Sequence, residues 1–218
     1  MLYTRLSTLL AVLALVFVSA CVNEQPDAVA DEMPEMETSA ASDADLAAAE
    51  LRSTLVDFRE MIAGLTPEQL AFRESPDRWS IAENAEHLLL VEDGLRPNLT
   101  VEPGMMSKTD SAATDEMIVA VYSDRSTPML APEPFVPQGQ FEGATADEII
   151  ANFQASRVAT IDAAESIEGD PRMIVAEHGA FGPIDAVQWM LTLSTHTERH
   201  LAQMQQVKDH TDYPSATM

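Results

Sequence analysis

Apolar side chains recur every three or four residues in several segments of the chain, which is the spacing of one face of an α-helix. The first such segment runs from about Asp45 to Gly64. Its apolar positions are Leu51, Leu55, Phe58 and Ile62. The spacing predicts an amphipathic helix with one face in a core, and a glycine at its end closes a helix at little steric cost.

A second helix is predicted over "SIAENAEHLLLVEDGLRP", where a polar start signal precedes the apolar stripe. Ser80 and Glu83 have the spacing of a capping box, in which each side chain bonds a backbone N–H of the first turn. The stripe consists of Ile81, Ala85, Leu88, Val91 and Leu95. His87 lies at its edge, and Pro97 is expected to end the helix because proline cannot continue it.

A third helix is predicted over "TADEIIANFQASRVATIDAAESI", residues 145–167. Thr145 and Glu148 have the spacing of a second capping box. The inward positions are Ile149, Phe153, Ser156, Thr160 and Ala164, with Ile150, Val158 and Ile161 widening the stripe. The pattern again indicates a helix with one buried side.

The last helix is predicted to start near Pro183 or Ile184, with Gly182 as its cap, and to continue to about Lys208. No segment alternates apolar and polar residues as a half-buried strand does, so no strand is expected. Four long amphipathic helices that share one core predict an all-α protein, a four-helix bundle.

The connection between the second and third helices is long and rich in proline and glycine. A short helix is indicated at about Asp115 to Tyr122, but "TPMLAPEPFVPQGQFEG" holds too many prolines for a helix or a central strand. Such a length is unusual between the helices of a compact bundle. We expect this connection to cover one end of the domain or to contribute to a site there.

The N-terminus has the pattern of an export signal. Arg5 supplies a positive start, and the apolar run from Leu9 to Val18 is too short for the roughly 20 residues of a membrane-spanning helix. "VSAC" resembles the bacterial lipoprotein signal, in which cleavage leaves the cysteine as a lipid-bearing N-terminus. Cys21 is the chain's only cysteine, so we expect a signal peptide at 1–20 and lipid attachment at Cys21. An ordinary signal peptide with an incidental cysteine is the alternative.

Composition divides the rest of the chain. Residues 21–43 are acidic, with two prolines and only isolated apolar positions, which predicts a disordered tether. The predicted helices then define a domain over residues 44–210, followed by a tail at 211–218. The formal net charge of −24 at pH 7 repels nucleic acid, which we therefore exclude as a partner.

Two histidines in the last helix are the first candidates for chemistry. His196 and His200 lie on one helical face, in the row that begins with Trp189 and Leu193, so both are expected to point inward. They are two ligands of one metal ion, neutral imidazoles bonded within the core, or side chains at the surface beside polar neighbours. The spacing alone leaves these alternatives open.

A third ligand is needed for a metal site of the usual kind, because catalytic zinc takes three protein ligands and leaves one position for water or a substrate atom. His87, on the second helix, is the natural third. Its rivals are His178, in the loop before the last helix, and His210, which lies about a quarter of a turn around the helix from His200.

No general acid or base can be named from the sequence. Glu83 lies one turn before His87, but the capping box already explains it, and Glu198 points away from the histidine pair and is expected to be solvated. The sequence H-T-E-R-H also lacks the glutamate that directly follows the first histidine in H-E-x-x-H zinc proteases. That proteolytic mechanism is excluded.

Three stretches together carry a family resemblance: "RWSIAENAEHL", "RSTPMLAPEPFVPQG" and "HGAFGPIDAVQWMLTLSTHTERHLAQM". A helix start before a histidine, a proline-rich middle and a final H-x-x-x-H helix resemble the DinB superfamily of bacterial four-helix proteins, which includes YfiT-like metal-dependent hydrolases. The resemblance spans about residues 45–208. It implies a DinB-like bundle in which His87, His196 and His200 bind a divalent metal ion, with zinc first and nickel or another transition metal as alternatives.

The resemblance implies a class of chemistry and no single reaction. Members include thiol transferases and a thiol-dependent isomerase, so the leading hypothesis is a lipid-anchored, metal-dependent hydrolase or thiol transferase. Its substrate would be a small molecule, with thiols among the candidates. The alternative hypothesis is a non-catalytic envelope protein that uses the same bundle for binding or in a stress response. The sequence leaves the oligomeric state open, a dimer included.

The residue after the cysteine bears on location. Many Gram-negative lipoproteins that stay at the inner membrane have aspartate there, and this chain has Val22. By resemblance to that sorting rule, we expect the protein on the periplasmic face of the outer membrane if its source has two membranes.

The lipid anchor gives the first prediction. Replacing the thiol that would carry the lipid, Cys21→Ser, should move the full chain from the membrane fraction to the soluble fraction of a Gram-negative host, as measured by fractionation and immunoblotting. Ser39→Ala, in the predicted tether, is the matched control and should leave the distribution unchanged. Persistent membrane association of the Cys21→Ser chain would contradict the anchor.

Overall fold

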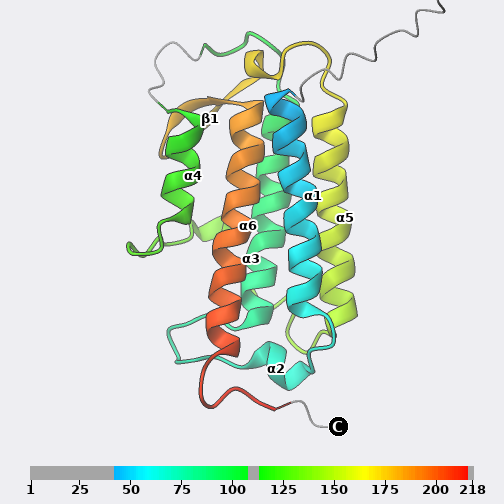
Figure 1. Cartoon of the computed structure of the whole chain (residues 1–218), viewed down its shortest axis with the longest axis vertical. Coiled ribbons are helices and arrows are strands. Elements are labelled where there is room, and N and C mark those ends of the chain that lie inside the picture. Colours follow the sequence, from blue (N-terminus) through cyan, green and yellow to red (C-terminus); the bar gives the residue numbers. More distant parts are fainter. Residues whose placement is uncertain (1–41, 108–112, 216–218) are drawn as a thin grey trace, which may run out of the picture. The chain divides into compact units, whose positions relative to one another are not determined.

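Four long helices form the core of the protein, as seen in a computed structural model that describes residues 42–107 and 113–215. These helices, α1 (Asp43–Ile62), α3 (Ile81–Leu95), α5 (Ala146–Glu165) and α6 (Ala186–Lys208), run alongside one another (Figure 1). α1 packs against α5 and α6, and α3 packs against the same two helices. The predicted all-α, four-helix fold is confirmed.

Some predicted features lie outside the described residues, namely the signal peptide, the lipid site at Cys21 and the tether up to residue 41. None of the helices in the described part of the chain combines the length and the apolar content that crossing a membrane requires.

Capping side chains set where the long helices begin. Ser80 and Thr145 form the two predicted capping boxes, each with the glutamate three positions on. Ser42 does the same for α1 with Asp45, so this helix starts slightly earlier than its apolar stripe indicates. Each cap satisfies backbone N–H groups that have no partner within the helix, which is worth about 1 kcal/mol.

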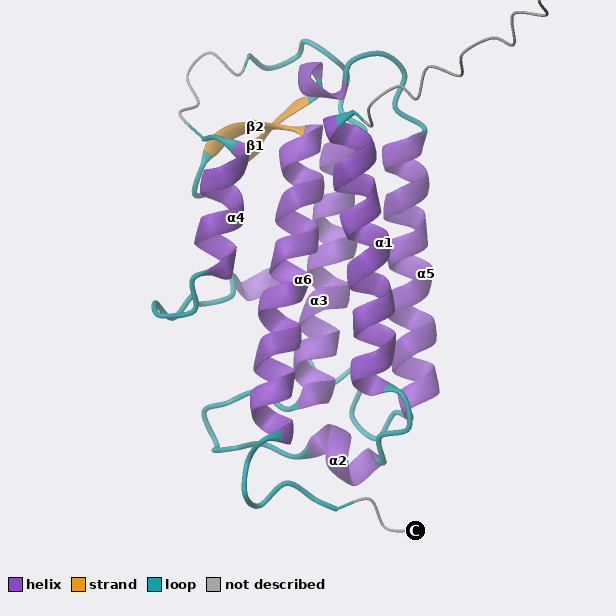
Figure 2. Cartoon of the chain, in the orientation of Figure 1, coloured by secondary structure: helices purple, strands orange, loops and turns teal. Residues whose placement is uncertain are grey.

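The entry to the last helix differs from the prediction. Residues Gly182–Asp185 form strand β2, which pairs antiparallel with β1 (Val175–His178) where α6 begins (Figure 2). The expectation of no strand was wrong, because strands of four residues are too short to display an alternating pattern. Asp185 caps α6 in place of Gly182, whose φ of 71° suits the hairpin turn.

Smaller differences follow from local chemistry. A short helix, α2 (Pro67–Ala71), is capped by Thr66 and has proline at its first position, a signal that the apolar pattern alone does not reveal. α3 ends at Leu95, before Pro97 as predicted, and a separate 3₁₀ turn follows from Arg96 to Leu99. Val158 does not widen the buried stripe of α5, because its side chain is exposed.

The proline-rich connection holds the predicted short helix, α4 (Asp115–Ser123), which packs along α6 outside the four-helix core (Figure 1). Arg172 connects the N-termini of three helices. It donates hydrogen bonds to Asp115 at the start of α4, Asp43 at the start of α1 and Asp185, the cap of α6. The bond to Asp115, more than the others, raises the pKa of Arg172 above its ordinary value.

A buried polar layer crosses the middle of the bundle, and we call it the Arg157 layer. Arg157 of α5 donates to Thr54 of α1, Glu92 of α3 and Thr197 of α6, at 2.7, 2.9 and 2.7 Å. None of the four residues is more than 1% exposed. Apolar clusters pack on either side of the layer, one with Leu51, Trp189 and Leu193, the other with Phe58, Leu88 and Phe153.

The layer predicts a large stability effect. Arg157→Leu leaves the Glu92 carboxylate buried without its partner, so we expect the free energy of unfolding to fall by about 3–5 kcal/mol in urea titrations followed by circular dichroism. Arg52→Leu is the matched control, because Arg52 of α1 forms an ion pair with Glu165 of α5 in which both side chains are about half exposed. Its removal should cost less than about 1 kcal/mol. Similar losses in the two variants would contradict this role of the layer.

Candidate metal centre

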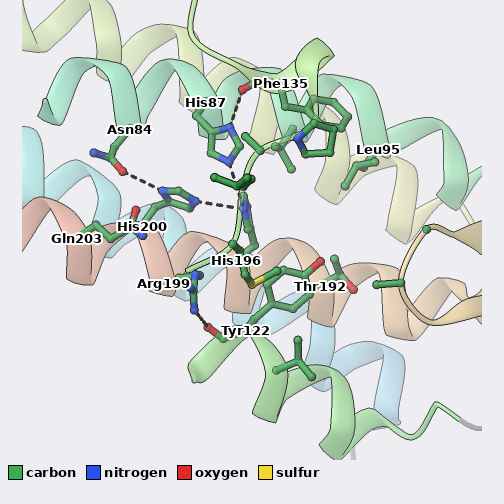
Figure 3. Close-up of a pocket in the computed structure, with 18 of the residues that line it drawn as sticks. Asn84, His87, Leu95, Tyr122, Phe135, Thr192, His196, Arg199, His200 and Gln203 are labelled. Atoms are coloured by element: carbon green, nitrogen blue, oxygen red, sulfur yellow. Dashed lines mark hydrogen bonds between the residues drawn. The ribbon is translucent and has the colours of Figure 1, made fainter. Parts of the chain in front are cut away.

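Three histidines from two helices converge on one point beside the core (Figure 3). Nε2 of His196 lies 3.3 Å from Nε2 of His87 on α3 and 3.2 Å from Nε2 of His200 on α6. One ring nitrogen from each residue lies within 4.8 Å of the other two. The structure thus brings together the three histidines that the sequence singled out, and we call them the three-histidine centre.

The outer nitrogen of His87 is held by the backbone. Its Nδ1 lies 2.6 Å from the carbonyl oxygen of Phe135 (Figure 3). A carbonyl oxygen can only accept, so Nδ1 carries the hydrogen and Nε2 presents its lone pair to the centre. The proline-rich connection therefore contributes directly to the site, which was one of the two roles predicted for it.

Two residues of α3 hold that carbonyl in place. A Cβ at Gly94 would lie 2.5 Å from the Phe135 ring, so only glycine lets the ring pack this closely on the helix. The buried carboxylate of Glu86 accepts hydrogen bonds from the backbone N–H groups of Gln138 and Gly139. The segment is thereby fixed on both sides of its contact with His87.

The outer nitrogen of His200 is held by a side chain. Nδ1 of His200 lies 2.8 Å from Oδ1 of Asn84, and Nδ2 of Asn84 donates to the carbonyl oxygen of Ser80 at 2.8 Å. The second bond sets the orientation of the amide, so Oδ1 accepts from His200. His200 then also directs the lone pair of Nε2 toward His196.

Burial keeps the three imidazoles neutral. Burial lowers the pKa of His87 below its ordinary value and lowers that of His200 further. For His196, burial acts first, and the charges of His87 and Arg199 add to it, so that the pKa falls to about 3. Neutral imidazoles are the form in which histidine binds metals.

The hydrogen-bond arrangement fits a cation. A hydrogen on Nε2 of His196 could bond only one of the two lone pairs that face it, which leaves the other buried without a donor. A divalent ion at the shared point satisfies all three nitrogens. Two ligands at 2.0–2.1 Å from tetrahedral zinc are roughly 3.3 Å apart, which agrees with the separations of 3.2 and 3.3 Å.

The centre opens into a cavity of about 800 Å³ between α3, α6 and α4. The Trp79 ring covers His87 and His200, with centroid distances of 4.9 and 6.1 Å. Arg199 donates to the carbonyl oxygens of Tyr122 and Thr127, which holds the end of α4 and the loop after it beside the centre. The cavity is therefore bounded by residues from segments far apart in the sequence.

The rival histidines lie elsewhere. His178 ends β1 and lines the cavity, where its Nε2 lies 3.2 Å from the Tyr122 hydroxyl, but it is not among the three converging rings. His210 lies beyond the end of α6, with its ring against Phe72. Neither replaces His87.

The glutamates considered as bases also act elsewhere. Glu83 accepts from the backbone N–H of Ser80 at 2.9 Å and forms an ion pair with Arg73, as the capping explanation requires. Glu198 is exposed on α6. The residues that sequence reasoning missed are Asn84, Glu86, Phe135 and Arg199. Asn84, Glu86 and Arg199 had a signal, since each lies within four residues of a histidine on its own helix, whereas Phe135 had none.

Comparison with known proteins agrees with this arrangement. The sequence matches the DinB superfamily over residues 50–204. The uncharacterized protein YuaE of Bacillus subtilis (strain 168) is 24% identical over 151 residues, which cover 68% of this chain and 88% of that protein. No solved structure matches the chain.

The bond between Asn84 and His200 gives a prediction about metal affinity. Asn84→Ala frees the His200 ring to rotate, so we expect zinc affinity to fall about 10- to 100-fold, as measured by competition with a chromophoric chelator. Asn152→Ala is the control, because Asn152 bonds only its own helix on the surface of α5. Circular dichroism would check that both variants fold. Equal zinc affinity in the two variants would show that His200 needs no such orientation.

Proposed function

The chain belongs to the DinB superfamily, and we propose that its three-histidine centre binds a divalent metal ion that acts on a small molecule held in the cavity. Zinc suits three neutral imidazoles, and nickel or another transition metal would also accept them. The convergence of the three Nε2 atoms carries the proposal, because without a cation at least one of the lone pairs directed at this point lacks a donor in the described part of the chain.

The chain's own residues prepare the site. Phe135 and Asn84 fix the rings of His87 and His200, and Trp79 shields both rings. A bound divalent ion would supply Lewis acidity at a coordination position that the three histidines leave open. Hydrolysis and thiol transfer are the two reactions that we propose for this arrangement.

The source of a thiol would be a second molecule. Cys21 is the only cysteine of the chain and, in our proposal, carries the lipid. The protein would then face the periplasm from the outer membrane of a Gram-negative source. A lipid anchor of this kind would hold the metal centre near substrates in the envelope.

A binding protein without catalysis is the second candidate, and one observation favours it. The carboxylates that line the cavity, Asp77 and Glu177, are both exposed, so neither is a buried base beside the centre. In this alternative the same cavity would bind its ligand through the metal without converting it.

The proposal predicts that purified protein takes up about one equivalent of zinc, as measured by elemental analysis. His196→Ala removes the central nitrogen, so the variant should fold, bind little zinc, and lose turnover of whichever ester, amide or thiol conjugate the wild type converts. Retained fold with lost turnover supports the enzyme, whereas zinc uptake without turnover on any of these substrates supports the binding protein.

Thr195→Val serves as the control, because the Thr195 hydroxyl bonds the Leu191 carbonyl within α6 and Thr195 does not line the cavity. A wild-type protein that takes up no divalent metal would remove the basis of the proposal.

A further inference from the structure

Two hydrogen-bond donors without partners belong to residues that line the cavity beyond the three-histidine centre. Nε1 of Trp189 and Oγ1 of Thr192 are buried, and neither bonds any group in the described part of the chain. The two residues are 2% and 1% exposed, and both line the cavity. A buried polar group without a partner is costly, so its retention points to a partner that enters the cavity.

A third donor follows from the bonds of His178. Its Nδ1 accepts from the backbone N–H groups of Ala180 and Phe181, at 3.1 and 3.3 Å. The imidazole therefore carries its hydrogen on Nε2 and donates it to the Tyr122 hydroxyl, 3.2 Å away. The Tyr122 oxygen accepts this bond, which leaves its own O–H free to donate to a molecule in the cavity.

These donors continue the row of the metal centre along α6. Thr192 is four residues before His196 and Trp189 is seven, so at 1.5 Å per residue they lie about 6 and 10 Å along the helix from it. Figure 3 shows His200, His196 and Thr192 following one another on α6. A molecule that reaches both the centre and these donors must be extended parallel to the helix.

The surroundings of the donors select an uncharged acceptor. Two arginines line the cavity: Arg199 is engaged by backbone carbonyl oxygens, and the exposed Arg78 forms an ion pair with Glu74. The carboxylates that line it, Asp77 and Glu177, are also exposed. Val91 and Leu95 line the cavity between α3 and α6. Neutral donors in an apolar cavity of an acidic protein favour a carbonyl oxygen over a carboxylate.

We propose that Tyr122, Trp189 and Thr192 form a donor patch that binds the carbonyl oxygen of an uncharged, elongated amide or ester whose other end reaches the three-histidine centre. The donor patch deepens the proposed function and rests on it for the position of the reacting end. It determines specificity at a place where the metal ion does not reach.

Two hydroxamic acids of equal chain length test the donor patch. One is hexanohydroxamic acid with a butanoylamido group at its far end, and the other is undecanohydroxamic acid, which lacks that carbonyl group. Both carry the same metal-binding head. Dissociation constants for zinc-loaded wild type, Thr192→Val and Trp189→Phe would be measured by calorimetry.

We expect each substitution to weaken binding of the amide probe about five- to tenfold, the size of one lost hydrogen bond, and to change binding of the hydrocarbon probe less than twofold. Thr195→Val is the control and should change neither. Equal effects on the two probes, or none on the amide probe, would overturn the donor patch.

Two further readouts do not depend on zinc. Thr192→Val removes a hydroxyl that has no hydrogen-bond partner in the described part of the chain, so the Tm of the variant should equal or exceed that of wild type. A clear fall in Tm would overturn the proposal. The indole N–H resonance of Trp189, assigned with Trp189→Phe, should move downfield with the amide probe and not with the hydrocarbon probe. Failure of the wild type to take up zinc would count against the proposed function, while these readouts still decide on the donor patch.

Discussion

The Arg157 layer fixes how the helices slide relative to one another, and the geometry of the three-histidine centre depends on it. One guanidinium bonds one side chain from each of the other three helices, so these three bonds form together in a single register. Thr197 adjoins His196, and Glu92 lies five residues after His87 on α3. Shifting α3 by one turn against α6 would leave Glu92 buried without its cation and would separate His87 from its partners.

The centre itself is held from outside by groups that are not candidate ligands. A backbone carbonyl of the proline-rich connection and an amide of α3 each bond the outer nitrogen of one imidazole. Because each group accepts a hydrogen bond from Nδ1, the two rings keep one tautomer and one orientation. The long connection thus has a physical reason: it passes over α3, where Gly94 admits the Phe135 ring, and places one carbonyl oxygen against His87.

The sequence predicted the parts of this arrangement that repeat along a helix. The apolar stripes, the capping boxes at Ser80 and Thr145, and the shared face of His196 and His200 all follow from a spacing of three or four residues. The sequence did not predict the hairpin before α6, because its strands of four residues are too short to show an alternating pattern. The contact between Phe135 and His87 could not be predicted for a different reason. Every residue has a backbone carbonyl, so the residue type gives no signal, and Phe135 lies 48 residues from His87 in the sequence.

Charge separates the surface of the protein from its cavity. The chain carries a formal net charge of −24, yet most side chains that line the cavity are neutral imidazoles, hydroxyls, indoles and apolar groups. Arg199 is engaged by carbonyl oxygens, and the other charged residues of the lining, Asp77, Arg78 and Glu177, are exposed. The net negative charge would attract a divalent ion, and the neutral imidazoles would coordinate it. An anionic substrate would be repelled by the net negative charge. Both properties agree with the proposals that the centre binds a metal ion and that the cavity binds an uncharged molecule.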